Sequence, residues 1–250
     1  MFTTSVWLPL RNRGLTPPAR LIISAVVLSI TAMVAGAADD PKVTPREVLD
    51  GLKSFWEKTA EKDGSFRPGI DPDYKGMSDS ALSDMAPLTY AVTLHKTLGW
   101  KLPHEKKTLA NLLGRQKEDG AFYHVNGTGD AKAPLTRVYN ATQGLVALHA
   151  LGAKPKYDPL PVFEEILDGD YQKLPLYTTS FFPLAYQCYG KTFPAEQDKK
   201  IRALMKQADD GYLDDHVAST FHLAHYYRLI GMRRLTPCFV SRSCRRISRR

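Results

Sequence analysis

A short glycine-containing pattern recurs along this chain and constrains its fold more than any other feature. EKDGSF at residues 61–66 returns as KEDGAF at 117–122, QADDGYL at 207–213 repeats the layout, and ILDGDY at 166–171 is a weaker copy. The glycines that mark the four copies are Gly64, Gly120, Gly169 and Gly211. Repeats at such intervals are typical of arrays in which one supersecondary unit stacks on the next.

The segments between the marker glycines have helical patterns. A polar, amphipathic segment precedes each marker, and a more apolar segment follows it and ends near a second glycine, at Gly99, Gly152, Gly190 and Gly231. Residues 141–152 and 217–231 are apolar or aromatic around most of a helix circumference, which predicts helices buried on both sides. The sequence therefore predicts an all-α fold of about four helical hairpins, with polar outer helices alternating with buried inner ones.

Capping residues and prolines predict where several of these helices begin. Thr44-Pro45-Arg46-Glu47 has the form of a capping box with proline at the first helical position. Pro87 and Pro183 are compatible with inner helices that begin near Asp84 and Ser180, because proline is tolerated in a first turn.

The two ends of the chain differ from its centre. Residues 1–37 combine three arginines, an uncharged apolar run and small residues at Ala35 and Ala37, which predicts a signal peptide and an exported protein. The alternative is an uncleaved segment that anchors the chain in a membrane. Residues 232–250 carry seven arginines and no lysine, and we expect them to be a disordered or frameshifted tail. Residues 38–231 are then the repeat domain.

The basic charge of the chain is confined to these ends. The formal net charge is +8, and removing the ten arginines of residues 1–38 and 232–250 leaves −2 for the centre. A centre without a basic surface argues against nucleic acid as a partner. Cys188 is the only cysteine outside the tail, so we expect neither a disulfide framework nor a metal site, and no cofactor.

The repeat resembles that of a known family. Gln116-x-x-x-Gly120-x-Phe122 and Gln207-x-x-x-Gly211-x-Leu213 are similar to the Gln…Gly-x-aromatic repeat of the prenyltransferase and squalene-oxidase (terpenoid cyclase) superfamily. The resemblance covers about residues 45–231, with Ala60 and Glu165 where glutamine is expected. It implies an α/α toroid whose inner helices surround a cavity. Four hairpins would make a partial toroid or an open horseshoe, or a fragment of a longer chain.

The repeat motif also has a structural interpretation. A glycine can take the left-handed conformation of a turn, an aspartate can accept its amide protons, and glutamine and aromatic side chains can bind the next repeat. Because a reaction rarely needs the same acid in every hairpin, we assign structural roles to Gln116, Asp119, Gly120, Phe122, Gln207 and Gly211.

The catalytic signatures of the superfamily are absent. The sequence has no Asp-x-Asp-Asp acid of the squalene–hopene type, no Asp-x-Cys zinc pair and no Gly-Cys-Gly-Glu-Gln thioester run. A zinc site at His216, His222 and His225 is excluded because the first and last lie on opposite sides of a helix. Whether the protein is an enzyme stays open.

Two long loops, at residues 65–77 and 121–134, could carry binding residues at the mouth of a cavity. The candidates are His124, Arg137, Tyr139, Asn140, Asp215 and His216.

Three functions fit these observations. The first is a cavity or concave face that binds a small molecule, a glycan or a protein. The second is an exported polysaccharide lyase or hydrolase, for which His124, Arg137 and Asn140 should converge. The third is a terpenoid cyclase or prenyltransferase proper, for which a cavity should be lined by aromatic residues such as Tyr90, Phe181, Phe182, Phe221 and Tyr226. We expect no membrane span beyond the N-terminal segment.

Overall fold

The computed structural model describes residues 43–169, 171–205 and 217–231. Contacts divide the chain into residues 1–42 and 43–250, and the description below concerns the second of these units. The predicted signal peptide, the arginine-rich tail and the predicted residues Gln207, Gly211, Asp215 and His216 lie outside the described residues.

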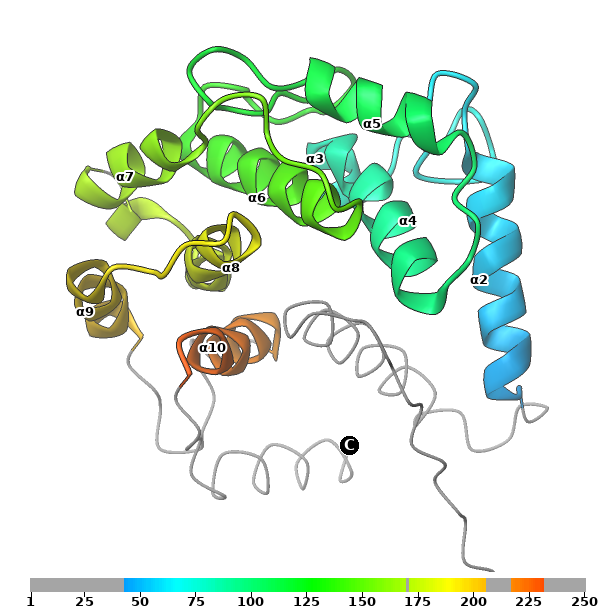
Figure 1. Ribbon diagram of the computed structural model, residues 1–250. Helices are drawn as coiled ribbons and strands as arrows, with labels where there is room; N and C mark the ends of the chain where they lie inside the picture. Colours follow the sequence, from blue (N-terminus) through cyan, green and yellow to red (C-terminus); the bar gives the residue numbers. More distant parts are fainter. Residues whose placement is uncertain (1–42, 170, 206–216, 232–250) are drawn as a thin grey trace, which may run out of the picture. The chain divides into compact units, whose positions relative to one another are not determined.

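The all-α prediction is confirmed for the described part of the chain, where the only β-type pairings are two isolated bridges. The helices, labelled in Figure 1, are α2 (Pro45–Thr59), α3 (Asp79–Leu82), α4 (Met85–Leu98), α5 (Glu105–Gly114), α6 (Pro134–Ala150), α7 (Leu160–Asp168), η1 (Tyr171–Lys173), η2 (Leu176–Ser180), α8 (Phe181–Cys188), α9 (Ala195–Leu204) and α10 (Val217–Leu229). None of the described helices is long and apolar enough to span a bilayer.

Four apolar helices pack on one another in chain order. α4 contacts α6, α6 contacts α8, and α8 contacts α10. α5 and α7 lie beside α6, as Figure 1 shows, and α9 is joined to α10 through the hydrogen bond from Tyr226 Oη to Asp198 Oδ1 at 2.6 Å. Large side chains such as Leu88, Leu145 and Phe182 are almost completely buried in this packing. The sequence predicts residues 141–152 and 217–231 to be buried on both sides; α6 is buried along most of its length, whereas α10 exposes Val217 and Phe221.

The predicted helix starts are confirmed. Thr44 and Glu47 form both hydrogen bonds of a capping box at the start of α2. α4 begins directly after Asp84 and α8 directly after Ser180, so Pro87 and Pro183 fall in first turns and interrupt neither helix.

The first two copies of the glycine pattern form the same turn. In the first copy the amide of Gly64 donates to Glu61 O at 3.0 Å, and in the second the amide of Gly120 donates to Lys117 O at 2.9 Å. An isolated bridge joins Ala60 to Phe66 in one copy and Gln116 to Phe122 in the other. Both glycines have positive φ, 88° and 83°.

The third copy does not form this turn. α7 continues to Asp168, directly before the marker glycine, whereas α2 and α5 end several residues earlier. Gly169 accordingly has a negative φ of −114°. The buried side chains of Ile166 and Leu167 hold the chain in the helix up to that point.

Candidate functional site

A carboxylate and two tyrosines form a hydrogen-bonded chain across three helices. Tyr90 Oη on α4 donates to Asp79 Oδ2 on α3 at 3.0 Å, and the hydroxyls of Tyr90 and Tyr139 are 3.3 Å apart. Because the Tyr90 proton is engaged by Asp79, Tyr139 on α6 is the donor of the second bond. The carboxylate thus organises both phenol groups.

Aromatic rings continue this chain onto two further helices. Tyr139 meets Phe181, the first residue of α8, edge to face at 5.8 Å, and Phe181 meets His222 of α10 edge to face at 5.4 Å. Phe221 then contacts His222 at 5.4 Å and His225 at 6.1 Å. We call the set Tyr90, Tyr139, Phe181, Phe221, His222 and His225 the aromatic face.

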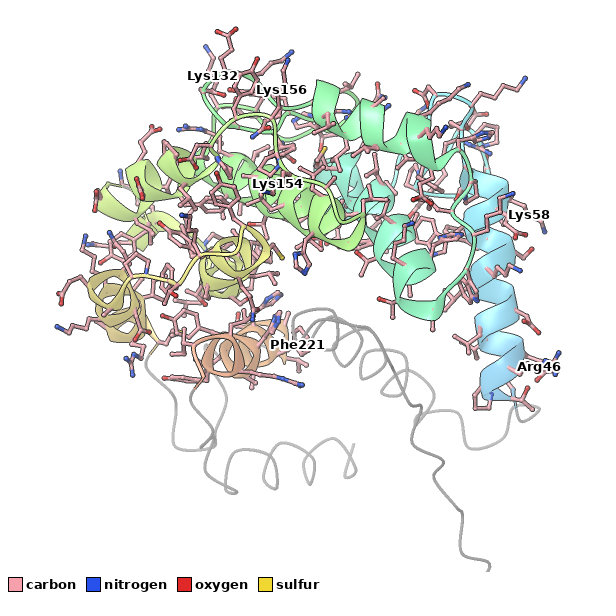
Figure 2. The ribbon with its side chains drawn as sticks, viewed as in Figure 1. Arg46, Lys58, Lys132, Lys154, Lys156 and Phe221 are labelled. Atoms are coloured by element: carbon pink, nitrogen blue, oxygen red, sulfur yellow. The ribbon has the colours of Figure 1, made fainter. Side chains whose placement is uncertain are left out.

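Both ends of the aromatic face are open to solvent, while its middle is buried. Tyr90 is 40% exposed and Phe221 is 36% exposed, whereas Tyr139 is 2% exposed. Figure 2 labels Phe221, which projects from α10. Exposed aromatic rings that pack on buried rings offer apolar contact area to a ligand. Because this packing already restricts the side chains, binding costs them little further conformational entropy.

Equivalent positions on neighbouring helices bring these rings together. Tyr90 is the sixth residue of α4 and Tyr139 is the sixth residue of α6, and the two helices pack directly on each other. Both helices are buried along most of their length, which fixes the register between the two tyrosines.

The 121–134 loop holds α3, and therefore Asp79, in place. The amide and hydroxyl of Thr128 both donate to Ala81 O at 2.9 Å, and the amide of Gly129 donates to Leu82 O at 3.1 Å. These carbonyls lie at the end of α3, and Asp79 is its first residue.

His124 and Asp84 fix the shape of the same loop. His124 Nδ1 accepts the Gly127 amide proton at 3.0 Å, so Nε2 carries the ring proton and donates to Gly129 O at 2.9 Å. Asp84 accepts the Val125 amide proton at 3.0 Å and pairs with the buried guanidinium of Arg115 at 2.7 Å.

Burial keeps the tyrosines and histidines of the aromatic face neutral, and Asp79 is a charged group beside them. Burial, and then the charge of Asp79, raise the pKa of Tyr90. Burial lowers the pKa of His222 to about 4, although the Asp79 charge acts in the opposite direction. Burial, the neighbouring His222 and Arg228 lower the pKa of His225 to about 4. Both imidazoles are therefore neutral at pH 7.

Ser180 and His222 form a pair that superficially resembles a nucleophile and its base. Ser180 Oγ lies 2.8 Å from His222 Nδ1, but Ser180 is completely buried and a histidine with a pKa of about 4 is a weak base. The pair is better suited to holding the His222 ring in one orientation. Cys188 is also unsuited to nucleophilic work, because burial raises the pKa of its thiol to about 12.

The residues expected to converge on a sugar bind separate partners. Arg137 makes two hydrogen bonds to Glu165, at 2.8 and 2.7 Å, and Asn140 is buried with Oδ1 accepting the Ser83 hydroxyl at 2.6 Å. His124 is engaged within its own loop. Of the predicted site residues in the described part of the chain, only Tyr139 belongs to the aromatic face.

The residues expected to line an aromatic cavity separate into two groups. Tyr90, Phe181 and Phe221 belong to the aromatic face. Phe182 instead packs on Phe163 of α7, and Tyr226 binds α9. The second group therefore joins α8 to α7 and α10 to α9.

The repeat-motif residues hold their turn and attach it to the following segment. Gln116 makes four hydrogen bonds, to Gly120, Lys156 and both polar groups of the Tyr157 backbone. Asp119 accepts the Ala121 amide proton at 3.0 Å. A Cβ on Gly144 would lie 2.5 Å from the Phe122 ring, so Phe122 packs directly against the α6 backbone.

Sequence reasoning missed Asp79 and the pairing of Ser180 with His222. Asp79 lies in a four-residue helix inside a polar stretch, and its partners Tyr90 and Tyr139 belong to two later helices. Its one local signal was its position a few residues before a predicted inner helix. Within the described ranges, no group of three or more His, Cys, Asp or Glu side chains could hold a metal ion.

Comparison with known proteins adds no assignment. No protein-family model and no curated protein matches this sequence.

Proposed function

We propose that this chain is an exported binding protein, built as an α/α-toroid-like array of helical hairpins similar to the prenyltransferase and squalene-oxidase repeat superfamily, and that its ligand lies on the aromatic face. The successive packing of α4, α6, α8 and α10 supports the array. The two matching turns, at Gly64 and Gly120, support the repeat.

One observation carries the binding role. Rings from α6, α8 and α10 are held in edge-to-face contact, Tyr90 of α4 joins them through the Tyr139 hydroxyl, and the row ends in exposed Tyr90 and Phe221. Aromatic side chains that serve only to fill a core are buried, whereas these two present apolar area to solvent on a rigid support. The described residues give this face no nucleophile or metal ligand set, so binding is the role that it supports best.

The proposal is tested with the neutral apolar fluorophore N-phenyl-1-naphthylamine. We expect saturable binding to the full chain, weakened about fivefold or more by Tyr90→Ala and by Phe221→Ala. Tyr74→Ala is the matched control, because Tyr74 is a similarly exposed tyrosine on the 65–77 loop. Equal affinity of all four proteins for the fluorophore would refute a ligand site on the aromatic face.

A further inference from the structure

We infer that the ligand of the aromatic face carries a positive organic charge, an ammonium group that contacts the carboxylate of Asp79 and the exposed ring of Tyr90. This inference rests on the proposed function and specifies its ligand class. Two features of the described residues point to it: a carboxylate without an ion-pair partner, and the exposed ring of Tyr90, whose hydroxyl is bonded to that carboxylate.

The carboxylate of Asp79 has unused capacity. Asp79 is exposed, and its carboxylate accepts from Tyr90 at 3.0 Å and from the hydroxyl of Ser78 at 3.4 Å, while a hydrogen bond with Asp79 adds to burial in raising the pKa of Tyr139. Among the ion pairs of the described residues, none involves Asp79. An ionised carboxylate offers about four acceptor positions, so Asp79 keeps acceptor capacity and an unpaired charge for a ligand. Asp84, by contrast, is paired with Arg115.

The surrounding rings suit a cation. Tyr90 and Tyr139 are linked to the carboxylate by hydrogen bonds, and the charge of Asp79 also raises the pKa of Tyr177 on η2, after burial. Tyr139 is buried, so the exposed ring of Tyr90 is the one that a ligand on Asp79 can reach. The negative face of an aromatic ring attracts ammonium groups, and aromatic cages for quaternary ammonium ions use this attraction.

At this end of the aromatic face, burial and the charge of Asp79 act on the pKa values of Tyr90, Tyr139 and Tyr177. His222, which contacts both Tyr177 and Phe181, is held neutral by burial. Arg228 acts on His225, at the other end of the face.

The same arrangement disfavours other ligand classes. A phosphate or carboxylate would meet the Asp79 charge, whereas Arg228 acts at the other end of the face, on His225. A neutral apolar molecule would gain contact with the rings but nothing from the carboxylate. Only a cation uses both elements of the site.

The test compares choline with 3,3-dimethyl-1-butanol, a neutral molecule of nearly the same shape, by NMR titration of the full chain. We expect choline to bind at least tenfold more tightly, with an affinity that falls as salt is raised. Asp79→Asn keeps the Tyr90 hydrogen bond and should reduce the choline affinity about tenfold, to the level of the alcohol. Asp73→Asn is the control, because Asp73 is an exposed acid on the neighbouring loop.

The outcomes separate this inference from the proposed function. Equal affinities for choline and the alcohol, unchanged by Asp79→Asn, would overturn the charge inference while ligand binding stands. Failure of both probes to bind would also overturn it, and the N-phenyl-1-naphthylamine titration would then decide the proposed function separately.

Discussion

Gln116 and Tyr157 are joined by two hydrogen bonds that run in opposite directions. Gln116 Nε2 donates to Tyr157 O at 2.8 Å, and Gln116 Oε1 accepts the Tyr157 amide proton at 3.0 Å. The buried side-chain amide of Gln116 therefore forms with the Tyr157 backbone the same pair of hydrogen bonds that a neighbouring β-strand would form. It fixes the segment before α7 to the turn that follows α5.

Gln116→Ala should destabilise the protein by about 2–4 kcal/mol, because it leaves the amides of Lys156 and Tyr157 and the carbonyl of Tyr157 without their partner. Urea denaturation followed by circular dichroism measures this loss. Gln172→Ala, at an exposed glutamine, should change the free energy of unfolding by less than about 0.5 kcal/mol. A similar small effect for Gln116→Ala would show that the turn does not depend on this side chain.

The parts of the fold that follow from local chemistry could be predicted from the sequence. Thr44 with Glu47 gives a capping box, Pro87 limits where α4 can begin, and Gly120 marks a turn, because each depends on residues a few positions away. Gly169 shows the limit of this reasoning. Its motif resembles the others, but burial of neighbouring apolar residues extends α7 to that glycine and removes the turn.

The aromatic face could not be predicted in the same way. Asp79 is linked to Tyr139 only because the 121–134 loop holds α3 and because α4 and α6 pack in one register. His124 looked like a catalytic residue, since a histidine in a long loop has no visible partner in the sequence. Its partners are the backbone groups of Gly127 and Gly129, which only the loop conformation reveals.

Two glycines with positive φ allow the energetic cost of the left-handed backbone conformation to be measured apart from the cost of close packing. Gly99 has φ of 69° and nothing within 4 Å of an added Cβ, so Gly99→Ala should cost only about 1–2 kcal/mol for the left-handed conformation. Gly120 has φ of 83° and an added Cβ would lie 1.9 Å from Asp158 O. Gly120→Ala should therefore cost at least about 2 kcal/mol more, measured by urea denaturation of both variants. Equal losses of unfolding free energy in the two variants would mean that the segments containing Gly120 and Asp158 can move apart without an energetic cost.

Asp84→Asn should loosen the 121–134 loop. The change leaves the guanidinium of Arg115 buried without its carboxylate, and we expect a loss of about 2–4 kcal/mol. Because the loop carries exposed Lys132, trypsin should cleave after that residue several times faster than in the unaltered protein. Glu118→Gln, at an exposed acid, should leave the rate unchanged. An unchanged cleavage rate in Asp84→Asn would show that other contacts hold the loop.

His222 should make the protein less stable in acid. Its pKa is about 4 in the folded state and about 6.5 when unfolded, so between these values the unfolded chain binds more protons and stability falls as the pH is lowered. The loss from this group reaches at most about 3 kcal/mol by pH 4. The groups facing His222 are Asp79, Tyr177, Ser180 and His225, and the last contributes a loss of the same sign.

His222→Asn removes the titrating group and retains a polar atom for Ser180. The variant should therefore lose less free energy of unfolding between pH 7 and pH 4.5 than the unaltered protein, whatever its stability at pH 7. Urea denaturation at the two pH values measures the difference, and each protein serves as its own reference. If both proteins lost the same free energy of unfolding, protonation of His222 would not be linked to unfolding. The His222 ring would then accept a proton while it stays between Phe181 and Phe221.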